Sequence, residues 1–273
     1  MKVHILGSTG LLGCYVFKYL KAQGHNVLGY TRAEINALSP DLSKLSGVLT
    51  VDDVIVNCIG LLKPNIKCDK EAIVVNREFP LILDVLSRDI GCKLINFSSD
   101  CVFSGDKGNY IETDECDATD IYGITKTHQD IQSTVIRASF IGEEISNKIG
   151  LLEFALKNKG KLVKGYTNCL WNGVTGLQIA KIIDKMIRED GVCFWNGVRH
   201  IFSDRVVSKY EIINMLNKAY KLNLTSVPVK ASKISNTIIK QTLDRSLSSV
   251  YNRIEVPSLE EMIYEQRNYI YEN

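Results

Sequence analysis

The stretch VHILGSTGLLG, residues 3–13, determines how the rest of this sequence is interpreted. Residues 3–6 form a short, apolar, β-branched run that predicts a strand. Gly7, Gly10 and Gly13 follow, and apolar residues at helical spacing continue through residue 23. Such a turn lets backbone N–H groups and the start of a helix meet a pyrophosphate. The stretch therefore predicts a dinucleotide-binding turn, and no G-K-[ST] sequence follows that would favour a P-loop.

The first half of the chain alternates strand patterns with helical patterns. Short apolar runs predict further strands over residues 26–30, 54–58, 93–98 and 134–138. Helical spacing covers residues 68–89, where Pro80 should kink or interrupt the helix, and residues 122–132. This alternation indicates βαβ units, and hence an α/β fold with a Rossmann-type doubly wound parallel sheet and helices on both faces.

The second half alternates less regularly. It predicts helices over residues 151–158, 175–188, 208–220 and 259–271, and short strands near residues 200–203 and 225–229. No low-complexity linker separates the two halves, so we expect them to pack together. We predict a dinucleotide-binding core in residues 1–140 and a smaller, mainly substrate-binding lobe in residues 141–273, with some of its elements returning to the core.

Composition argues against several classes of function. The 273 residues carry 33 basic and 31 acidic side chains spread along the chain, which disfavours nucleic acid or an anionic membrane as a partner. The eight cysteines stand singly, without a C-x-x-C pair, which fits a reducing cytoplasm. The four histidines lack metal-ligand spacing, so we expect surface or packing roles and no metal site. No apolar run approaches the ~18 residues of a membrane span, so we expect a cytoplasmic protein.

The end of the second predicted strand bears on the choice of dinucleotide. A carboxylate there would bind the ribose hydroxyls of NAD, whereas an arginine can accommodate the 2′-phosphate of NADP. The sequence LGYTRAE supplies Thr31 and Arg32, with Glu34 close by. Arg32 favours NADPH, and Glu34 leaves NADH possible.

A tyrosine and a lysine lie four residues apart in DIYGITK, residues 120–126. Tyr122 and Lys126 would share one helical face, and a tyrosine with a pKa near 10 needs such a positive charge to lower that pKa. Alone, this spacing more often marks two solvated side chains. Ser98 and Ser99, however, fall at the end of a predicted strand, where ligands of open α/β sheets bind. A hydroxyl there can hydrogen-bond a substrate carbonyl while the tyrosine delivers a proton.

Several motifs occur together and in order along the chain. They are GSTGLLG at residues 7–13, PDL at 40–42, VIVNCIG at 54–60, VNREFP at 75–80, FSSDCVFSG at 97–105, DATDIYGITK at 117–126 and VIRASFIG at 135–142. In this order the chain resembles the extended short-chain dehydrogenase/reductases, and within them the dTDP-4-dehydrorhamnose reductases and their sugar-nucleotide relatives.

The resemblance implies a Ser/Thr–Tyr–Lys catalytic set, which maps onto Ser99, Tyr122 and Lys126, with the lysine also bonding the nicotinamide ribose. The residues then expected around the cofactor are Gly7, Thr9, Gly10, Leu11, Leu12, Gly13, Arg32, Asp41, Cys58, Ile59, Gly60, Asn76, Tyr122, Lys126 and Ser139. Those expected beside the substrate directly after the catalytic serine are Asp100, Cys101 and Val102.

Two departures from the family pattern concern the substrate. Family reductases commonly read S-T-D-Y-V-F where this chain reads S-S-D-C-V-F, so Cys101 removes a ring beside the sugar. Where relatives carry Gly-x-Pro-Thr, this chain has Trp171, which either stacks on a base or sugar or simply packs. A substrate diphosphate also needs a cation in the second half. Arg205 is the first candidate and Lys164 the second. Asp204 and Arg205 also stand at a predicted strand-to-helix junction, where an acid or Ser208 would cap the helix, which favours a structural role for this stretch.

The resemblance thus implies an NADPH- or NADH-dependent reductase of a nucleotide-linked 4-keto-6-deoxy sugar. Two alternatives stay open: a nucleotide-sugar epimerase of the same fold, and a non-catalytic NADP-binding regulatory subunit like that of methionine adenosyltransferase. Family members are often homodimers, but no feature of this sequence decides the oligomeric state.

Overall fold

The computed structural model describes residues 1–144, 148–189, 194–234, 237–238 and 242–272. The chain divides into two compact units, and neither is continuous in sequence. The first comprises residues 1–102, 116–137 and 179–199, and the second comprises residues 103–115, 138–178 and 200–273. The first unit thus ends close to the predicted boundary after residue 140 and takes in residues 179–199 from the second half, whereas residues 103–115 join the second unit.

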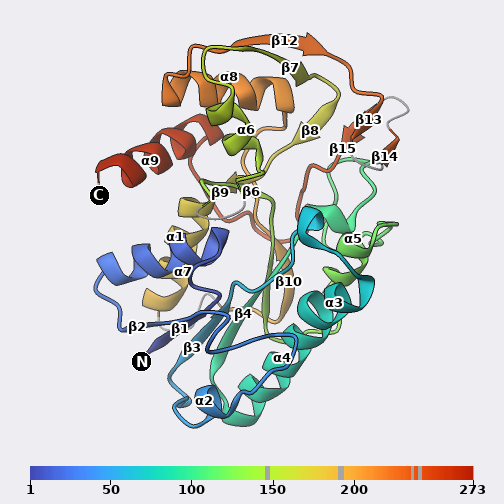
Figure 1. The fold of residues 1–273 in the computed structure, drawn as a ribbon. Coiled ribbons are helices and arrows are strands. Elements are labelled where there is room, and N and C mark those ends of the chain that lie inside the picture. The colour runs from blue at the N-terminus through green and yellow to red at the C-terminus, as the bar shows by residue number, and fades with distance from the viewer. Residues whose placement is uncertain (145–147, 190–193, 235–236, 239–241, 273) are drawn as a thin grey trace. The chain divides into compact units, whose positions relative to one another are not determined.

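A parallel sheet forms the centre of the first unit (Figure 1). Across the described residues it has six strands in the order β10-β5-β4-β3-β1-β2, and the neighbours from β5 to β2 pair in parallel. Strands β1, β3 and β5 are buried throughout, as expected where helices cover both faces. The strands are β1 (Val3–Leu6), β2 (Val27–Tyr30), β3 (Val54–Asn57), β4 (Lys93–Ser98), β5 (Thr134–Arg137) and β10 (Gly197–His200).

The strand order creates a topological switch point between β1 and β3. The chain leaves β1 to form β2 on one side and returns on the other side as β3. Ligands of open α/β sheets bind outside the carboxyl ends of the strands at such a point. The glycine turn follows β1 and the loop beginning at Cys58 follows β3, so both predicted cofactor segments lie at this edge.

Helices lie on both faces of the sheet. Figure 1 shows α1 and α7 on one side and α3 and α4 on the other. His25, just after α1, contacts Asp184 of α7 with 2.5 Å between Nε2 and Oδ1, and on the opposite face Phe79 of α4 packs in a core with Ile55 of β3. The helices are α1 (Leu11–Ala22), α2 (Ser43–Ser46), α3 (Asp69–Ile73), α4 (Phe79–Ile90), α5 (Ile121–Thr125) and α7 (Gly176–Arg188), with short turns η1 (Lys63–Asn65), η2 (Val74–Glu78, π-helical) and η3 (Asp100–Val102).

The five strands predicted in the first half are confirmed to within one residue, but the helix predicted over residues 122–132 is wrong, because α5 ends at Thr125. Thr125 turns its hydroxyl back onto the Ile121 carbonyl at 2.7 Å, and His128 adopts a left-handed backbone with φ 53°. An α-helix cannot continue through that conformation. Pro80 stands in the first turn of α4 directly after η2, so the regular helix is interrupted there by a π-helical turn.

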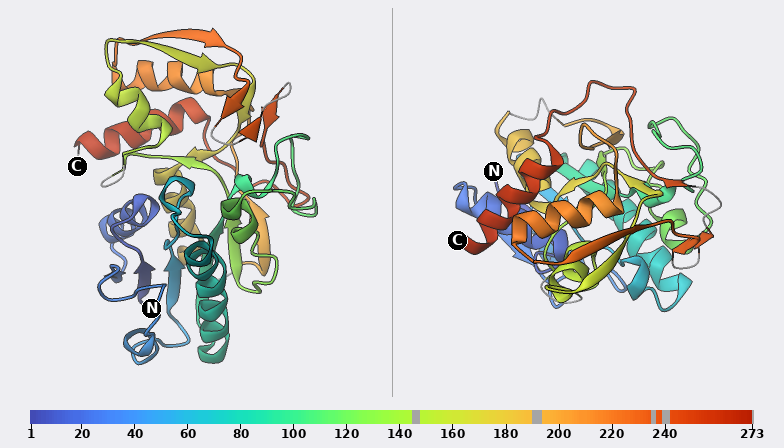
Figure 2. Two further views of the ribbon diagram at one scale, coloured as in Figure 1. Left: turned by 45° about the vertical axis from the view of Figure 1, so that its right-hand side comes forward. Right: turned by 90° about the horizontal axis from the view of Figure 1, so that it is seen from above.

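The second unit contains a parallel pair of strands, β7 and β12, against which α8 packs, and α8 also contacts α6 and α9 (Figure 2). Ser208 and Glu211 form a capping box at the start of α8, so the capping role favoured for Ser208 is confirmed. The four predicted helices are confirmed to within one residue, whereas the strand predicted over residues 200–203 lies at β10, three residues earlier. The elements are β6 (Phe140–Ile141), α6 (Leu151–Lys157), β7 (Leu162–Tyr166), β8 (Cys169–Trp171), β9 (Val174–Thr175), β11 (Val207–Ser208), α8 (Lys209–Tyr220), β12 (Thr225–Val229), β13 (Lys233–Ile234), β14 (Thr237–Ile238), β15 (Leu243–Asp244) and α9 (Leu259–Glu272).

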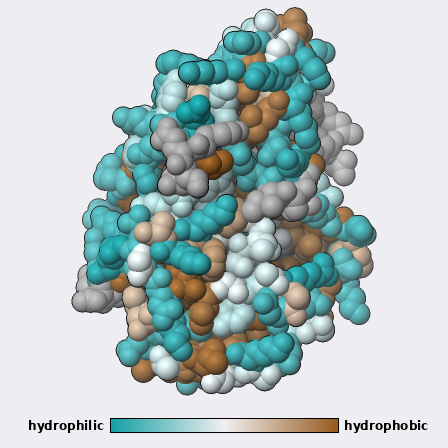
Figure 3. All heavy atoms as spheres, turned by 60° about the vertical axis from the view of Figure 1, so that its left-hand side comes forward, coloured by the Kyte–Doolittle hydropathy of each residue, from teal (hydrophilic) through white to brown (hydrophobic). Residues whose placement is uncertain are grey.

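The surface carries mixed polarity. On the face shown in Figure 3, hydrophobic residues form separate groups among more numerous hydrophilic ones. Among the described residues, no helix combines the length and the apolar character that crossing a membrane requires.

Candidate active site

The turn after β1 brings backbone atoms into close contact with α1 and with the loop after β3. Gly7 has φ 75°, which glycine adopts without strain, and its N–H donates to the Tyr30 carbonyl at 2.8 Å. A Cβ added at Gly13 would overlap the Gly7 carbonyl oxygen and lie 2.8 Å from the Gly7 carbonyl carbon. A Cβ at Gly7 would lie 3.1 Å from Cγ1 of Ile59. The two glycines therefore permit a three-way contact among the turn, the helix and the β3 loop.

Helix α1 begins at this turn with Gly10 as its N-cap, and glycine has no side chain that could accept from the first N–H groups. The first backbone N–H groups of a helix have no intrahelical acceptor and favour a negative charge. Leu12 is buried and Thr9 is exposed, so an anion at this end of the helix would meet backbone donors and one exposed hydroxyl. A pyrophosphate fits these groups.

Asn76 shapes the loop that follows β3. It is fully buried in η2, where its Oδ1 accepts from the Leu61 N–H at 2.8 Å and its Nδ2 donates to the Leu61 carbonyl at 3.0 Å. A Cβ added at Gly60 would lie 3.4 Å from the same Oδ1. The amide of Asn76 thus binds the backbone of the loop that carries Cys58 and Gly60, and its contact with a cofactor stays a prediction.

Ser99, Tyr122 and Lys126 come together at the carboxyl end of β4. Ser98, the last residue of β4, donates to the Lys126 carbonyl at 2.6 Å, and the adjacent Ser99 lies close enough to Tyr122 to lower the pKa of its phenol. The Nζ atom of Lys126 lies 3.8 Å from the position that a Cβ would take on Gly60. Lys126 therefore lies beside the β3 loop, which in turn contacts the glycine turn at Gly7.

The three residues after Ser99 form η3, and they differ in whether they contact the Ser99 hydroxyl. The Ser99 hydroxyl donates to Oδ1 of the buried Asp100 at 3.1 Å and accepts from the Cys101 N–H at 3.1 Å. Val102 is fully buried, and its carbonyl accepts from the Ala118 N–H at 3.0 Å. Asp100 and Cys101 orient the serine hydroxyl, whereas the side chain of Val102 packs inside the unit.

Burial raises the pKa of Tyr122 above its usual value. The neighbouring Cys101, Asp100 and Asp120 act in the same direction, and the Ser99 hydroxyl opposes them. The pKa of Tyr122 is therefore raised in this structure, whereas the spacing to Lys126 predicts a lower one, because burial is the dominant effect. At neutral pH Tyr122 holds its proton, so it is poised to donate one.

Burial also lowers the pKa of Lys126, to about 8, while the Cys58 thiol acts weakly in the opposite direction. A group with this pKa remains mostly protonated at pH 7. The site therefore pairs a protonated phenol with a positively charged amine at neutral pH, and the amine loses its charge in mildly alkaline solution.

Asp120 connects α5 to the β3 loop. Its carboxylate accepts from the Gly123 N–H at 3.2 Å, which caps the helix, and it forms an ion pair with Lys63 at 2.8 Å between Oδ2 and Nζ. Both side chains are about one-third exposed, so solvent screens the attraction. Its main consequence is geometric, because it ties the loop to the helix that carries Tyr122.

The residues after β2 include a carboxylate that is hydrogen-bonded to its own loop and an exposed arginine. Glu34 accepts hydrogen bonds from the N–H and the hydroxyl of Thr31, both at 2.6 Å, and these bonds lower the pKa of the carboxyl group. Arg32 is exposed and makes no ion pair with any residue that the structure describes. Asp41 is also exposed and accepts from the Ser43 N–H at 3.0 Å.

The remaining predicted residues lie in the second unit and are placed within that unit alone. The Ser139 carbonyl accepts from the Val174 N–H at 3.0 Å. Trp171 is half-buried in β8, and its ring occupies the space that a Cβ on Gly173 would need. Arg205 is exposed, 3.8 Å from Glu211. Lys164 is exposed on β7.

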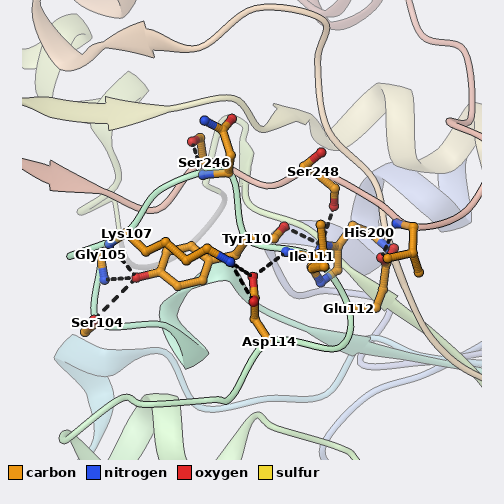
Figure 4. Close-up of polar contacts among 12 residues, drawn as sticks. Ser104, Gly105, Lys107, Tyr110, Ile111, Glu112, Asp114, His200, Ser246 and Ser248 are labelled. Atoms are coloured by element: carbon orange, nitrogen blue, oxygen red, sulfur yellow. Dashed lines mark hydrogen bonds and ion pairs between the residues drawn. The ribbon is translucent and has the colours of Figure 1, made fainter.

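A segment of the second unit that directly follows Val102 is held by a polar cluster (Figure 4). The Tyr110 hydroxyl accepts from the N–H groups of Gly105 and Lys107, each at 3.1 Å, and its ring stacks on Phe103 with 4.1 Å between centroids. Glu112 accepts from the His200 N–H at 2.9 Å. These contacts give the segment a defined shape although it contains no regular helix or strand.

A second group of buried residues, namely Ser98, His128 and Arg137, lies next to Lys126. The sequence pattern predicts no functional role for His128 and Arg137, and for Ser98 only a hydroxyl that could contact a substrate carbonyl. The one signal that pointed to this group is the arginine inside the apolar run VIRAS, because a charge in a buried strand requires partners.

The sheet order, the glycine turn at its switch point and the Ser99–Tyr122–Lys126 group place this chain among the Rossmann-type α/β proteins. More specifically, it belongs to the family described as the RmlD substrate binding domain, whose model matches residues 1–148.

Two curated relatives match part of the chain. The spore coat polysaccharide biosynthesis protein SpsK of Bacillus subtilis (strain 168) is 30% identical over 154 residues, which cover 51% of this chain and 53% of SpsK. Methionine adenosyltransferase 2 subunit beta of Xenopus tropicalis is 31% identical over 137 residues, which cover 45% of this chain and 39% of that protein. The matches thus span about half of the first relative and less of the second.

A solved structure extends the similarity to the whole fold. The dTDP-4-dehydrorhamnose reductase of Bacillus anthracis str. Ames, in complex with NADP, superposes with a TM-score of 0.78 over 100% of this chain and 99% of that one, at 18% identity. At this identity the likeness shows a shared fold, which includes both units.

Proposed function

We propose that this protein reduces the keto group of a nucleotide-linked 4-keto-6-deoxy sugar, with NADPH as its reductant. The observation that carries the proposal is the grouping of Ser99, Tyr122 and Lys126 beside the loop that contacts the glycine turn. Membership of the RmlD family and the fold shared with a dTDP-4-dehydrorhamnose reductase support the substrate class.

In the proposed reaction, the nicotinamide supplies a hydride to the ketone carbon. Tyr122 donates its phenolic proton to the ketone oxygen, so the carbonyl becomes a hydroxyl and the tyrosine becomes a phenolate. The Ser99 hydroxyl would turn its single proton from Asp100 to the same oxygen, while it still accepts from the Cys101 N–H. The positive charge of Lys126 stabilises the negative charge that proton donation leaves in the site.

The preference for NADPH over NADH rests on the residues after β2. A 2′-phosphate requires a cation that is free to approach it, and Arg32 is exposed without an ion pair among the described residues. The ribose hydroxyls of NADH require a free carboxylate, but Glu34 is hydrogen-bonded to Thr31 through its N–H and its hydroxyl. The backbone donors at the start of α1 suit the pyrophosphate of either cofactor.

The direct test is to incubate the purified protein with NADPH and a panel of dTDP-, UDP- and GDP-linked 4-keto sugars. We expect the absorbance of the reduced cofactor to fall with one substrate class, and NMR of the product to show a new hydroxyl-bearing carbon. If no sugar in the panel is consumed and no cofactor is oxidised, the proposal fails.

The same assay separates the two alternatives. An epimerase would convert the sugar without net loss of NADPH. A regulatory subunit would bind NADPH but convert nothing. The partial similarity to methionine adenosyltransferase 2 subunit beta is the reason to test this alternative. The presence of all three residues of the catalytic set favours an enzyme over a regulatory subunit, and the consumption of NADPH distinguishes a reductase from an epimerase.

A further inference from the structure

The chain after α5 is held by buried side chains and not by a continuing helix. Lys126 is the last residue with a helix-type bond, from its N–H to the Gly123 carbonyl at 3.2 Å, and two residues later His128 has φ 53°. A lysine at the frayed end of a five-residue helix would ordinarily be poorly fixed. Contacts from β4 and β5 must therefore hold it in place.

Those contacts form a chain of donors that ends on the lysine backbone. Arg137 Nε donates to Ser98 Oγ at 3.1 Å, and Ser98 Oγ donates to the Lys126 carbonyl at 2.6 Å. The direction is fixed, because an arginine has no acceptor and a carbonyl has no proton. Arg137 Nη2 also donates to the Thr127 carbonyl at 3.0 Å.

His128, two residues after Lys126, makes a further buried hydrogen bond to β4. Its Nε2 lies 3.1 Å from the Phe97 carbonyl, so Nε2 must carry the ring proton. Burial, Lys126 and Arg137 together hold the pKa of His128 well below its usual value, so the ring is neutral. The exposed fractions of Ser98, His128 and Arg137 are 6%, 5% and 1%, so water cannot replace these bonds.

We propose that Arg137 and Ser98 are positioning residues for Lys126, which hold its backbone so that its amine lies against Gly60 and the Cys58 thiol. The placement of the amine is independent of the reaction, whereas its importance for catalysis rests on the function proposed above. Arginine suits this task because its planar group presents several donors at once, and here it spans the Ser98 hydroxyl and the Thr127 carbonyl.

Two opposing effects set the pKa of the Lys126 amine in its buried position. Burial, which is the larger effect, lowers the pKa, and the Cys58 thiol raises it. If Ser98 or Arg137 no longer held the backbone, the amine would be able to move toward water, where a lysine regains its usual pKa. The pKa of Lys126 and its access to a reagent therefore report whether the backbone is held.

The test uses competitive chemical labelling of amines in the full-length protein, read by peptide mass spectrometry from about pH 6 to about pH 11. Ser98→Ala removes the bond to Lys126 without adding bulk, and Arg137→Lys keeps the charge but loses the paired donors. Ser87→Ala is the matched control, because Ser87 is equally buried and donates to a main-chain carbonyl, that of Asp84 at 3.0 Å, away from the site.

We expect the labelling midpoint of Lys126 to lie near pH 8 in the wild type and the control. In Ser98→Ala it should rise by about one pH unit or more, with about five-fold faster labelling. Arg137→Lys should do the same if it folds, which its circular dichroism and melting temperature will show. An unchanged Lys126 midpoint and rate in folded Ser98→Ala would overturn the proposal.

Activity measurements separate this inference from the proposed function. If the wild type reduces a 4-keto sugar, Ser98→Ala should lower kcat more than it raises KM for NADPH, and Ser87→Ala should change neither. If the wild type reduces none of the sugars tested, the proposed function fails, but a shifted labelling midpoint still supports the positioning of Lys126. A lower kcat without any change in labelling contradicts the positioning role.

Discussion

Replacing Gly13 with alanine tests the close contact on which the proposed cofactor site depends. The added methyl group would overlap the Gly7 carbonyl oxygen and lie 2.8 Å from the Gly7 carbonyl carbon and 3.1 Å from the Ser8 Cα. All three are backbone atoms, so no side-chain rotation relieves the overlap. Either α1 moves away from the turn or the turn opens, and the N–H groups at the start of α1 shift relative to Gly7.

The magnitude follows from two opposing effects. Overpacking of this kind costs ~1–3 kcal/mol, while alanine gains ~1 kcal/mol over glycine inside a helix. We therefore expect a net loss of up to about 2 kcal/mol, which lowers the melting temperature by up to a few degrees in a chain of this size. NADPH should bind about ten-fold or more weakly, equivalent to about 1.4 kcal/mol, because the displaced N–H groups no longer converge on the pyrophosphate.

Gly47→Ala is the matched control, because its Cβ would also lie 3.2 Å from a backbone oxygen, that of Ser43, and Gly47 is not part of the glycine turn. We expect its affinity for NADPH, measured by quenching of protein fluorescence or by calorimetry, to stay within about three-fold of the wild type. If Gly13→Ala binds NADPH as the wild type does and melts at the same temperature, the close approach of helix and turn has no part in cofactor binding.

Three further outcomes follow from the site. Tyr122→Phe should lower kcat by about 10²–10⁴-fold while NADPH affinity changes little, and a variant that turns over normally would remove Tyr122 as the proton donor. Arg32→Ala should weaken NADPH binding about ten-fold, as measured by KM, and leave NADH almost unaffected, whereas equal losses for both cofactors would contradict a contact with the 2′-phosphate. Turnover should fall as pH rises through about 8, where Lys126 loses its charge. Because the pKa of Lys126 is lower in the folded chain than in the unfolded chain, its contribution to the free energy of unfolding should increase between about pH 8 and pH 10.5. Lys126→Met should abolish both the fall in turnover, measured by pH-dependent kinetics, and the rise in stability, measured by denaturation at several pH values.

The parallel sheet could be predicted from sequence because its strands are short buried runs separated by glycine or polar residues, a pattern that depends little on tertiary contacts. The end of α5 could not be predicted in this way. Residues 122–132 have helical spacing, but His128 forms a hydrogen bond with the Phe97 carbonyl and has a left-handed backbone conformation. Such a conformation depends on tertiary contacts. The pKa of Tyr122 was also missed, because the spacing to Lys126 shows a nearby charge but does not show the burial that outweighs it.

The raised pKa of Tyr122 favours one direction of the proposed reaction. In reduction, hydride arrival turns the ketone oxygen into an alkoxide, which is a much stronger base than any phenolate, so proton transfer from Tyr122 remains favourable even with its pKa raised. Oxidation of the product alcohol would instead require Tyr122 to lose its proton first, which burial and the carboxylates of Asp100 and Asp120 oppose at neutral pH. The charge on Lys126 reduces the cost of the phenolate but disappears above about pH 8. Burial raises the pKa of Tyr122, where the sequence predicts a lower one. It therefore makes the site better suited to a reductase than to a dehydrogenase.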